Sequence, residues 1–433
     1  MSRLVIAGMA ALLGILPAAS VSASPPLDGP GQEALAGSAP GATVEGILSI
    51  AREMNPEVAA SALETEAALA RVDAAGRLPD PMFKTEFKDI DRGRDSAVPD
   101  ELGRVEYRIE QTFPLWGKLA LQKDVARARA GVARDMQRAA ELAVAARIKT
   151  VFAEYFAAFE GARLSQELSH TVATVAAVTR SRYAQGIGEQ DDAIRSEVER
   201  TRLRTELIRF EADQRRTAAR LNALMNRDVS VALTEPAALR PVPTEALTLA
   251  ALLDAGRSDN PEIGASRSQI IAAEGDKALV GKSWYPDVTL GVAFQQFVDE
   301  DRRSPGYEAM IGVEVPLQWG LREAWEREAT ANLAVARKRH EAADTNVRGD
   351  LTDAFWSLDG ARRSGEILQS VQLPQAKLAF QAALRGYEQG RSSLNTVLDT
   401  EQQVYATMLR LLASQVEQQA RLAEIERLIG RDL

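Results

Sequence analysis

Four segments of the chain alternate between apolar positions and positions that are small or charged. Their apolar positions are Phe83 and Phe87; Val105, Tyr107, Ile109 and Phe113; Val288, Leu290, Val292 and Phe294; and Tyr307, Ala309, Ile311, Val313 and Val315. A period of two over about ten residues predicts strands with one apolar face, as in lipid-facing barrel strands around a wet lumen. Half-buried hairpins of a soluble protein show the same alternation, but the charges on the opposite face favour the barrel.

The rest of the chain shows the three-and-four spacing of buried helical stripes. One stripe runs through Val125, Ala128, Val132 and Met136, and then through Ile148, Val151, Tyr155 and Phe159. The predicted helices are 44–76 and 247–281, two very long ones at 118–185 and 321–389, and two return helices at 189–226 and 392–430. Each long helix would span roughly 100 Å, and a moderate helix and a return helix together span nearly the same length. Two shorter helices are therefore expected to stack end to end beside each long one.

An internal repeat explains why each type of element occurs twice. Asn55-Pro56-Glu57-Val58 returns as Asn260-Pro261-Glu262-Ile263, Tyr183-Ala184-Gln185-Gly186 returns as Tyr387-Glu388-Gln389-Gly390, and Arg227-Asp228 returns as Arg431-Asp432. Similar segments in the same order at nearly constant spacing indicate a duplicated unit. The predicted organisation is a first repeat at 44–228, a linker at 229–246 and a second repeat at 247–433. The fold class is mainly α with a small β part.

The first residues have the pattern of an export signal. Arg3 precedes an apolar run, 4–16, and Val21-Ser22-Ala23 has the small residues of a cleavage site. We therefore expect a signal peptide at 1–23 and a flexible tail at 24–43. The apolar run is too short for a membrane anchor and is broken by Pro17. The chain has no cysteine, so neither a disulfide nor a cysteine-linked lipid is available to it.

Composition excludes several classes of function. A net charge of −9 argues against nucleic acid as a partner. The sequence contains no nucleotide-binding loop, nucleophile elbow or metal-ligand spacing, which argues against an enzyme and against a cofactor. His170 and His340 are the only histidines, and neither has a second ligand one helical turn away. No metal site is predicted in this chain.

Four strands do not close a channel, and open strand edges are not tolerated in lipid. The chain is therefore expected to share a barrel with copies of itself. Cyclic symmetry repeats one interface until the ring closes, and three copies would give a 12-stranded barrel.

The sequence resembles the TolC-type outer membrane factors, and within them the CzcC-like heavy-metal branch, from about Val44 to Leu433. The doubled Asn-Pro-Glu start, 78–81 (Leu-Pro-Asp-Pro) before the first hairpin, 111–118 (Gln-Thr-Phe-Pro-Leu-Trp-Gly-Lys) after it, and the paired Tyr-x-x-Gly turns carry this resemblance. The resemblance implies a homotrimer with a barrel in the lipid of the outer membrane and a helical barrel in the periplasm. It also implies a periplasmic adaptor and an inner-membrane RND-type transporter as partners.

The same resemblance indicates two groups of functional residues. Tyr183, Gly186, Gly188, Tyr387, Gly390 and Arg391 would lie at the periplasmic tip and contact the adaptor, although hairpin geometry alone explains the glycines. Asp399 matches the family's ring of aspartates that narrows the channel, Thr396 replaces a second aspartate of that ring, and Asp192 lies at the corresponding place in the first copy. Asp399 is equally compatible with a solvated carboxylate, and Asp192 with the start of a helix.

The predicted function is a passive exit duct of a tripartite efflux system, with heavy-metal cations as its cargo. The alternatives are the same fold exporting drugs, small organic molecules or polypeptides, and a periplasmic coiled-coil protein that forms no channel. The coiled coil would explain the helices but not the paired strands of the two repeats.

Overall fold

The computed structural model describes residues 41–91, 101–186, 189–243, 247–297 and 305–433. The first repeat contains α1 (Val44–Met54), α2 (Pro56–Ala75), β1 (Met82–Asp91), β2 (Glu101–Phe113), α3 (Lys118–Ala184) and α4 (Gln190–Leu224). The second contains α5 (Leu249–Asp259), α6 (Pro261–Gly281), η1 (Lys282–Trp284), β3 (Val288–Phe297), β4 (Gly306–Val313), α7 (Trp319–Ile367), η2 (Leu368–Gln372), α8 (Leu373–Glu388) and α9 (Leu394–Ile429). The predicted signal peptide and nearly all of the predicted tail lie outside the described residues.

The moderate helix expected at the start of each repeat is two helices, because the chain leaves the helical conformation at an asparagine. Asn55 has ψ 124° and Asn260 has ψ 123°, and each precedes a proline, which disfavours the α conformation in the residue before it. Each asparagine then caps the next helix, since the Oδ1 of Asn55 accepts hydrogen bonds from the N–H groups of Glu57 and Val58. The prediction of unbroken helices at 44–76 and 247–281 is therefore wrong.

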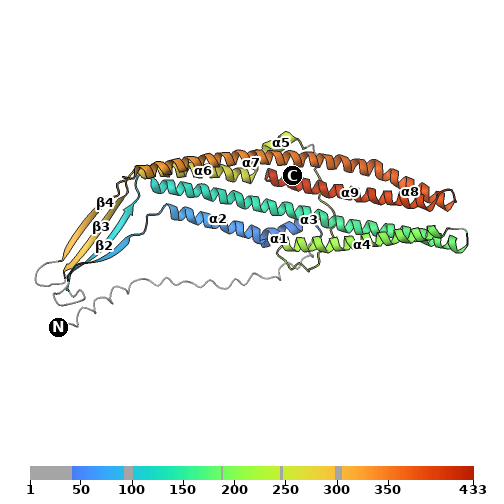
Figure 1. The fold of residues 1–433 in the computed structure, drawn as a ribbon, viewed down its shortest axis with the longest axis horizontal. Helices are drawn as coiled ribbons and strands as arrows, with labels where there is room; N and C mark the ends of the chain where they lie inside the picture. Colours follow the sequence, from blue (N-terminus) through green and yellow to red (C-terminus); the bar gives the residue numbers. More distant parts are fainter. Residues whose placement is uncertain (1–40, 92–100, 187–188, 244–246, 298–304) are drawn as a thin grey trace, which may run out of the picture. The chain divides into compact units, whose positions relative to one another are not determined.

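The same asparagines join the helices that stack end to end. The Nδ2 of Asn55 donates to the carbonyl of Leu224 at the end of α4, at 2.7 Å, and the Nδ2 of Asn260 donates to Leu428 near the end of α9, at 2.9 Å. Helices α2 and α4 both pack on α3, and α6 and α9 both pack on α7 (Figure 1). The expected stacking of two shorter helices beside each long helix is thus present in both repeats.

The long helix of the first repeat is continuous for 67 residues, whereas its counterpart is interrupted. A π-helical turn, η2, separates α7 from α8, and Pro374 lies in the first turn of α8. A π turn holds one more residue than an α turn. Accordingly, Gly117 and Gly320 before the turn are 203 positions apart, and Gly186 and Gly390 after it are 204 apart. The prediction of one unbroken helix at 321–389 is therefore wrong.

The four strands form one antiparallel sheet in the order β1-β2-β3-β4. Its register sets the apolar positions opposite one another: Phe83 pairs with Ile109, Ile109 with Val292, and Val292 with Ala309. The side chains on this face have little cover, since Tyr307 is 86% exposed and Ile311 75% exposed. The charged and small residues share the opposite face, as the alternation predicts.

Each repeat has its own apolar core, formed where its first helix packs against its long helix and its return helix. In the first repeat Ile47 of α1 packs with Ile148 and Tyr155 of α3 and Leu221 of α4. In the second repeat Leu252, Leu351, Leu358 and Ile425 form the equivalent cluster on α5, α7 and α9. Met136, predicted to be part of the buried stripe, is instead 51% exposed in a groove lined by α2, α3 and α6.

Candidate gate and lumen-facing residues

The turn of the first hairpin, between α3 and α4, places Tyr183 and Gly186, two of its three predicted residues, on the surface. Gly186 has φ +70°, a left-handed conformation that glycine adopts without steric cost, and the chain reverses there. Tyr183, one turn earlier, is 46% exposed. Gly188 lies outside the described residues. An exposed tyrosine beside a glycine turn leaves an aromatic surface for a partner.

The turn of the second hairpin, between α8 and α9, is built more tightly. Gly390 has φ +69°, and the backbone N–H of Arg391 donates to the carbonyl of Gly386 at 2.7 Å. A Cβ on Gly386 would lie 2.7 Å from the Oγ of Ser392, so a larger residue there would displace the Ser392 side chain. Tyr387 is 6% exposed, unlike its counterpart Tyr183. Of the two tyrosines predicted at the tip, one is therefore on the surface and the other is packed.

Arg182 covers Tyr387 and links the first hairpin to the second. Its guanidinium carbon lies 5.1 Å from the centre of the Tyr387 ring, and its Nη1 donates to the Tyr387 carbonyl at 3.3 Å. Burial, followed by Asp192, raises the pKa of the Tyr387 hydroxyl. The structure thus brings Asp192 into the surroundings of Tyr387. Sequence reasoning missed Arg182, which the 204-residue spacing aligns with Gly386.

Asp192 itself is half-buried in the first turn of α4, which begins after Glu189 without a side-chain cap. Burial and then the neighbouring carboxylates of Glu189 and Asp191 raise the pKa of the Asp192 carboxyl, while Arg182 and Arg195 oppose this rise. Asp192 therefore lies among charges of both signs at the junction of the two hairpins.

Asp399 is exposed on α9, past the first turn of that helix. The helix is capped by Ser393, whose Oγ accepts from the N–H of Thr396 at 3.3 Å, so Asp399 is free of any capping role. Thr396 is exposed as well and also contacts Ser393 through its hydroxyl. The predicted gate residues Asp399 and Thr396 therefore share one end of α9.

Arg195 is a second residue that sequence reasoning missed. Its Nε donates to Asp191 at 2.6 Å, and this hydrogen bond is the main reason why the pKa of its guanidinium is raised. Asp192 and Asp399 raise it further. The turn glycines align Arg195 with Asp399, so equivalent positions of the two repeats carry opposite charges that act on each other.

The polar face of the sheet carries a ladder of ion pairs on the strands of the first repeat. Lys84 lies 2.7 Å from Glu110, and the carboxylate of the fully buried Glu106 pairs with both Lys88 and Arg108. The second repeat contributes mainly Gly291, Ala293 and Gly312 to this face, together with Glu308 and Met310. One face is thus charged while the other is apolar, as a wall between water and lipid requires.

Neither histidine has the surroundings of a metal ligand. The Nδ1 of His340 lies 2.8 Å from the Oγ of Ser266, and His170 is exposed on α3. Among the described residues no group of three or more histidine, cysteine or carboxylate side chains is placed to hold a metal ion. In the same part of the chain, every helix is too short or too polar to cross a membrane.

A duplicated helix–strand–helix unit with a sheet that is apolar on one face and ionic on the other defines a class of membrane duct proteins. The chain matches the outer membrane efflux protein family over residues 47–227 and 252–431, and it belongs to that family. It is an outer membrane efflux channel that extends into the periplasm, and not an enzyme. The predictions of a TolC-type factor and of its location are confirmed.

Individual relatives differ in their cargo. The chain is 23% identical to the cobalt-zinc-cadmium resistance protein CzcC of Cupriavidus metallidurans, over 90% of both chains. It is 24% identical to the pyoverdine export outer membrane protein OpmQ of Pseudomonas putida, over 87% of this chain and 81% of that protein. Its fold is similar to the crystal structure of the outer membrane protein VceC of Vibrio cholerae, with a TM-score of 0.77, 17% identity, and coverage of 90% and 96% of the two chains.

Proposed function

We propose that this chain forms a homotrimeric exit duct that passively conducts heavy-metal cations across the outer membrane. A periplasmic adaptor and an inner-membrane RND-type transporter would deliver the cargo to it. The observation that carries the proposal is the four-stranded sheet, which has an apolar face, an ionic face and two edges. Within the described residues, β1 and β4 each pair with one strand only.

The two edges are the main argument for an assembly of copies. A strand edge in lipid leaves backbone N–H and C=O groups without partners, at a cost of several kcal/mol for each group. If β4 of one copy pairs with β1 of the next, every edge is satisfied once the ring closes. Three copies of this sheet supply 12 strands, within the size range of known outer membrane barrels.

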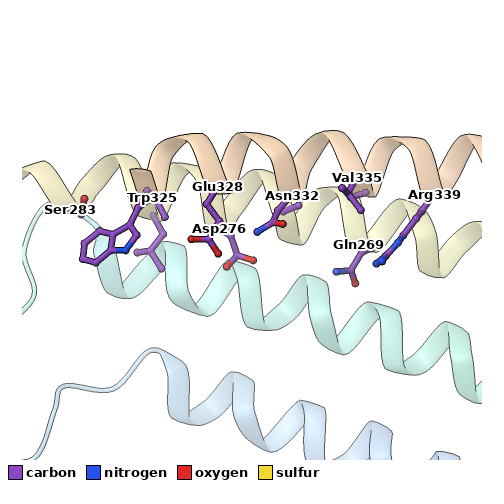
Figure 2. Close-up of a pocket in the computed structure, with 13 residues that line it drawn as sticks. Gln269, Asp276, Ser283, Trp325, Glu328, Asn332, Val335 and Arg339 are labelled. Atoms are coloured by element: carbon purple, nitrogen blue, oxygen red, sulfur yellow. The ribbon is translucent and has the colours of Figure 1, made fainter. Parts of the chain in front are cut away.

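The helices support the same interface. Helix α2 packs on α3, α3 on α6, and α6 on α7, so α2 and α7 are the flanking helices of this layer. A groove of about 710 Å³ runs along α6 and α7. Figure 2 shows Trp325 and Ser283 at one end of it and Arg339 and Gln269 at the other. We propose that α2 of a second copy, with Leu63 64% exposed, fills this groove.

The argument for metal cations is chemical and rests on the gate. Three copies of Asp399 around an axis would concentrate negative charge and favour cations, and a duct without a tight site allows its cargo to leave. One relative, CzcC, is named for cobalt, zinc and cadmium resistance, and the chain matches it over 90% of its length. The positive charge of Arg195 partly offsets the negative charge of Asp399, which weakens this argument.

The relative OpmQ favours a second candidate, the export of a small organic molecule by the same duct. Metal export and export of a small organic molecule can be distinguished by deleting the gene for this chain. Growth is then measured with zinc, cobalt or cadmium, and separately with organic toxins. A loss of metal tolerance that is restored by the full chain supports metal export. Unchanged metal tolerance with increased sensitivity to organic compounds would contradict it. Polypeptide export predicts neither change. A periplasmic coiled coil without a channel is incompatible with the family.

A further inference from the structure

Two carboxyl groups from different repeats meet inside the helical part of the protein. Glu199 on α4 is 4% exposed and Glu401 on α9 is 2% exposed. Glu199 is the tenth residue of α4, and Glu401 is the eighth residue of α9. Neither carboxylate oxygen of Glu401 accepts a hydrogen bond from the rest of the described chain. A buried carboxylate without a partner is costly unless it holds a proton.

The contacts around this pair come from α4, α9 and α3. On α4, Arg202 forms an ion pair with Glu199 at 2.5 Å, and its guanidinium carbon lies 5.4 Å from the centre of the Tyr405 ring. On α9, the Nε2 of Gln402 donates to Glu199 at 2.8 Å. On α3, the hydroxyl of Ser165 forms a hydrogen bond with the Tyr405 hydroxyl at 2.8 Å. Glu199 is therefore well satisfied as an anion, and Glu401 is not.

The electrostatics agree with this assignment. Burial, and then the carboxylate of Glu199, raise the pKa of Glu401 to about 8, although Arg202 opposes the rise. At neutral pH Glu401 is consequently uncharged and has one O–H group to donate, and Glu199 is the adjacent acceptor. Ionisation of Glu401 would place two buried carboxylates close together, with Arg202 as the one positive charge that acts on both.

We propose that Glu199 and Glu401 share one proton and form a proton-dependent latch between the first hairpin (α3 and α4) and the second (α7, α8 and α9). Loss of the proton weakens the contact between α4 and α9, and rebinding restores it. As a regulatory device of the duct, the latch rests on the proposed channel function. As a contact between two helices, it is independent of that function.

The sign of the pH effect follows from the two states of the latch. When the helices separate, Glu401 meets water and its pKa returns towards the ordinary value of 4.5. The packed state holds the proton up to about pH 8, so packing is favoured at low pH and is lost progressively as the pH rises from about 4.5 to about 8. Above pH 8 no further loss is expected, because both states are then ionised.

The absence of cysteine allows a direct measurement. Leu203 on α4 is fully buried against Val172 of α3 and Tyr405 of α9, so a thiol in its place is reached only when the helices separate. The rate of maleimide labelling of the full-length Leu203→Cys protein in detergent should rise with pH relative to Leu203→Cys/Glu401→Gln. We expect the ratio of the two rates to grow by about tenfold or more between pH 6 and pH 8. Comparison at equal pH removes the titration of the thiol itself.

Glu197 provides the matched control, because the turn glycines align it with Glu401, yet it is half-exposed and paired with Arg180 and Arg200. Leu203→Cys/Glu197→Gln should follow Leu203→Cys at every pH. A constant rate ratio between Leu203→Cys and Leu203→Cys/Glu401→Gln would overturn the latch. So would an equal effect of Glu197→Gln.

Conductance of the cysteine-free protein in planar bilayers tests whether the latch regulates the duct. Open probability should rise from pH 6 to pH 8 in the native chain and stay constant in Glu401→Gln. Equal pH dependence of the two proteins would overturn the regulatory role. Complete absence of pores from protein that shows pH-dependent labelling would instead overturn the proposed channel function, while the latch would stand.

Discussion

The two repeats share one order of elements but differ in the side chains that connect them. The first repeat carries the ionic ladder on its strands, an unbroken α3 and an exposed Tyr183. The second has small residues on the same face of the sheet, a π turn between α7 and α8, and a buried Tyr387. Turn glycines, caps and apolar stripes therefore maintain the duplicated backbone. The polar residues that have diverged connect the repeats and form the candidate gate.

The largest loss of stability is expected on replacing Lys149, a buried residue of the first repeat that pairs with Glu426 near the end of the second repeat. Its Nζ lies 2.8 Å from Glu426, which also binds Arg240 of the linker at 2.7 Å. Removing one partner of a buried ion pair costs about 3–5 kcal/mol, so Lys149→Ala should lower the free energy of unfolding by about that amount. The equivalent residue is Thr352, and within the described residues its hydroxyl donates only to the carbonyl of Arg348 in the same helix. Denaturant unfolding in which Thr352→Ala is as damaging as Lys149→Ala would contradict the difference between the repeats.

The two faces of the sheet should respond differently to a charge. Leu290 lies on the apolar face, opposite Ile311, whereas Gly291 lies on the ionic face, where a Cβ would approach Glu110. Leu290→Arg should destabilise the membrane-inserted form by about 2–4 kcal/mol, because it places a cation in lipid. Gly291→Arg should insert but change conduction. Equal amounts of heat-resistant trimer from both variants would show that the assignment of the faces is wrong.

The helix junctions should respond alike in both repeats, in contrast to the polar residues that differ between them. Asn55→Ala and Asn260→Ala each remove a helix cap and leave a carbonyl at the end of the stacked helix without its donor. We expect a loss of about 2 kcal/mol in each case, measured by thermal or denaturant unfolding. A large loss at only one of the two positions would show that the junctions are not equivalent.

The smallest effect concerns the predicted gate, where Arg195 of the first repeat corresponds to Asp399 of the second. Asp399→Ala would remove three like charges from a trimer, and the preference for cations in planar bilayers should fall by about two- to fivefold, with assembly unchanged. Asp192→Ala should alter selectivity less, because its carboxylate lies between the start of α4 and Arg182. Unchanged selectivity in Asp399→Ala, together with a change in Asp192→Ala, would contradict the assignment of the gate to the second repeat.

The elements were predictable where a local pattern encodes them. Alternation predicted which face of the sheet carries Val292 and which carries Gly291, and the glycines predicted the reversals at Gly186 and Gly390. The breaks at Asn55 and Asn260 were missed, although the prolines that follow were a sufficient signal. The π turn was also missed, yet the change in repeat spacing from 203 to 204 records its extra residue.

The contacts between repeats were less predictable, because they depend on how α4 lies against α9 and on which hairpin faces the other. Nothing in the spacing of Arg182 shows that it covers Tyr387, or that Arg195 lies among Asp191, Asp192 and Asp399. The sequence places Glu401 on a helix but does not show that it is buried. Its burial follows only from the packing of three helices.

The most direct test of the trimeric duct is the mass of the full-length protein purified from outer membranes in detergent. Light scattering corrected for bound detergent should give three chains per particle, because two unpaired strand edges per chain require a closed ring. A particle of one chain that stays folded, with both edges of the sheet unpaired, would contradict the shared barrel.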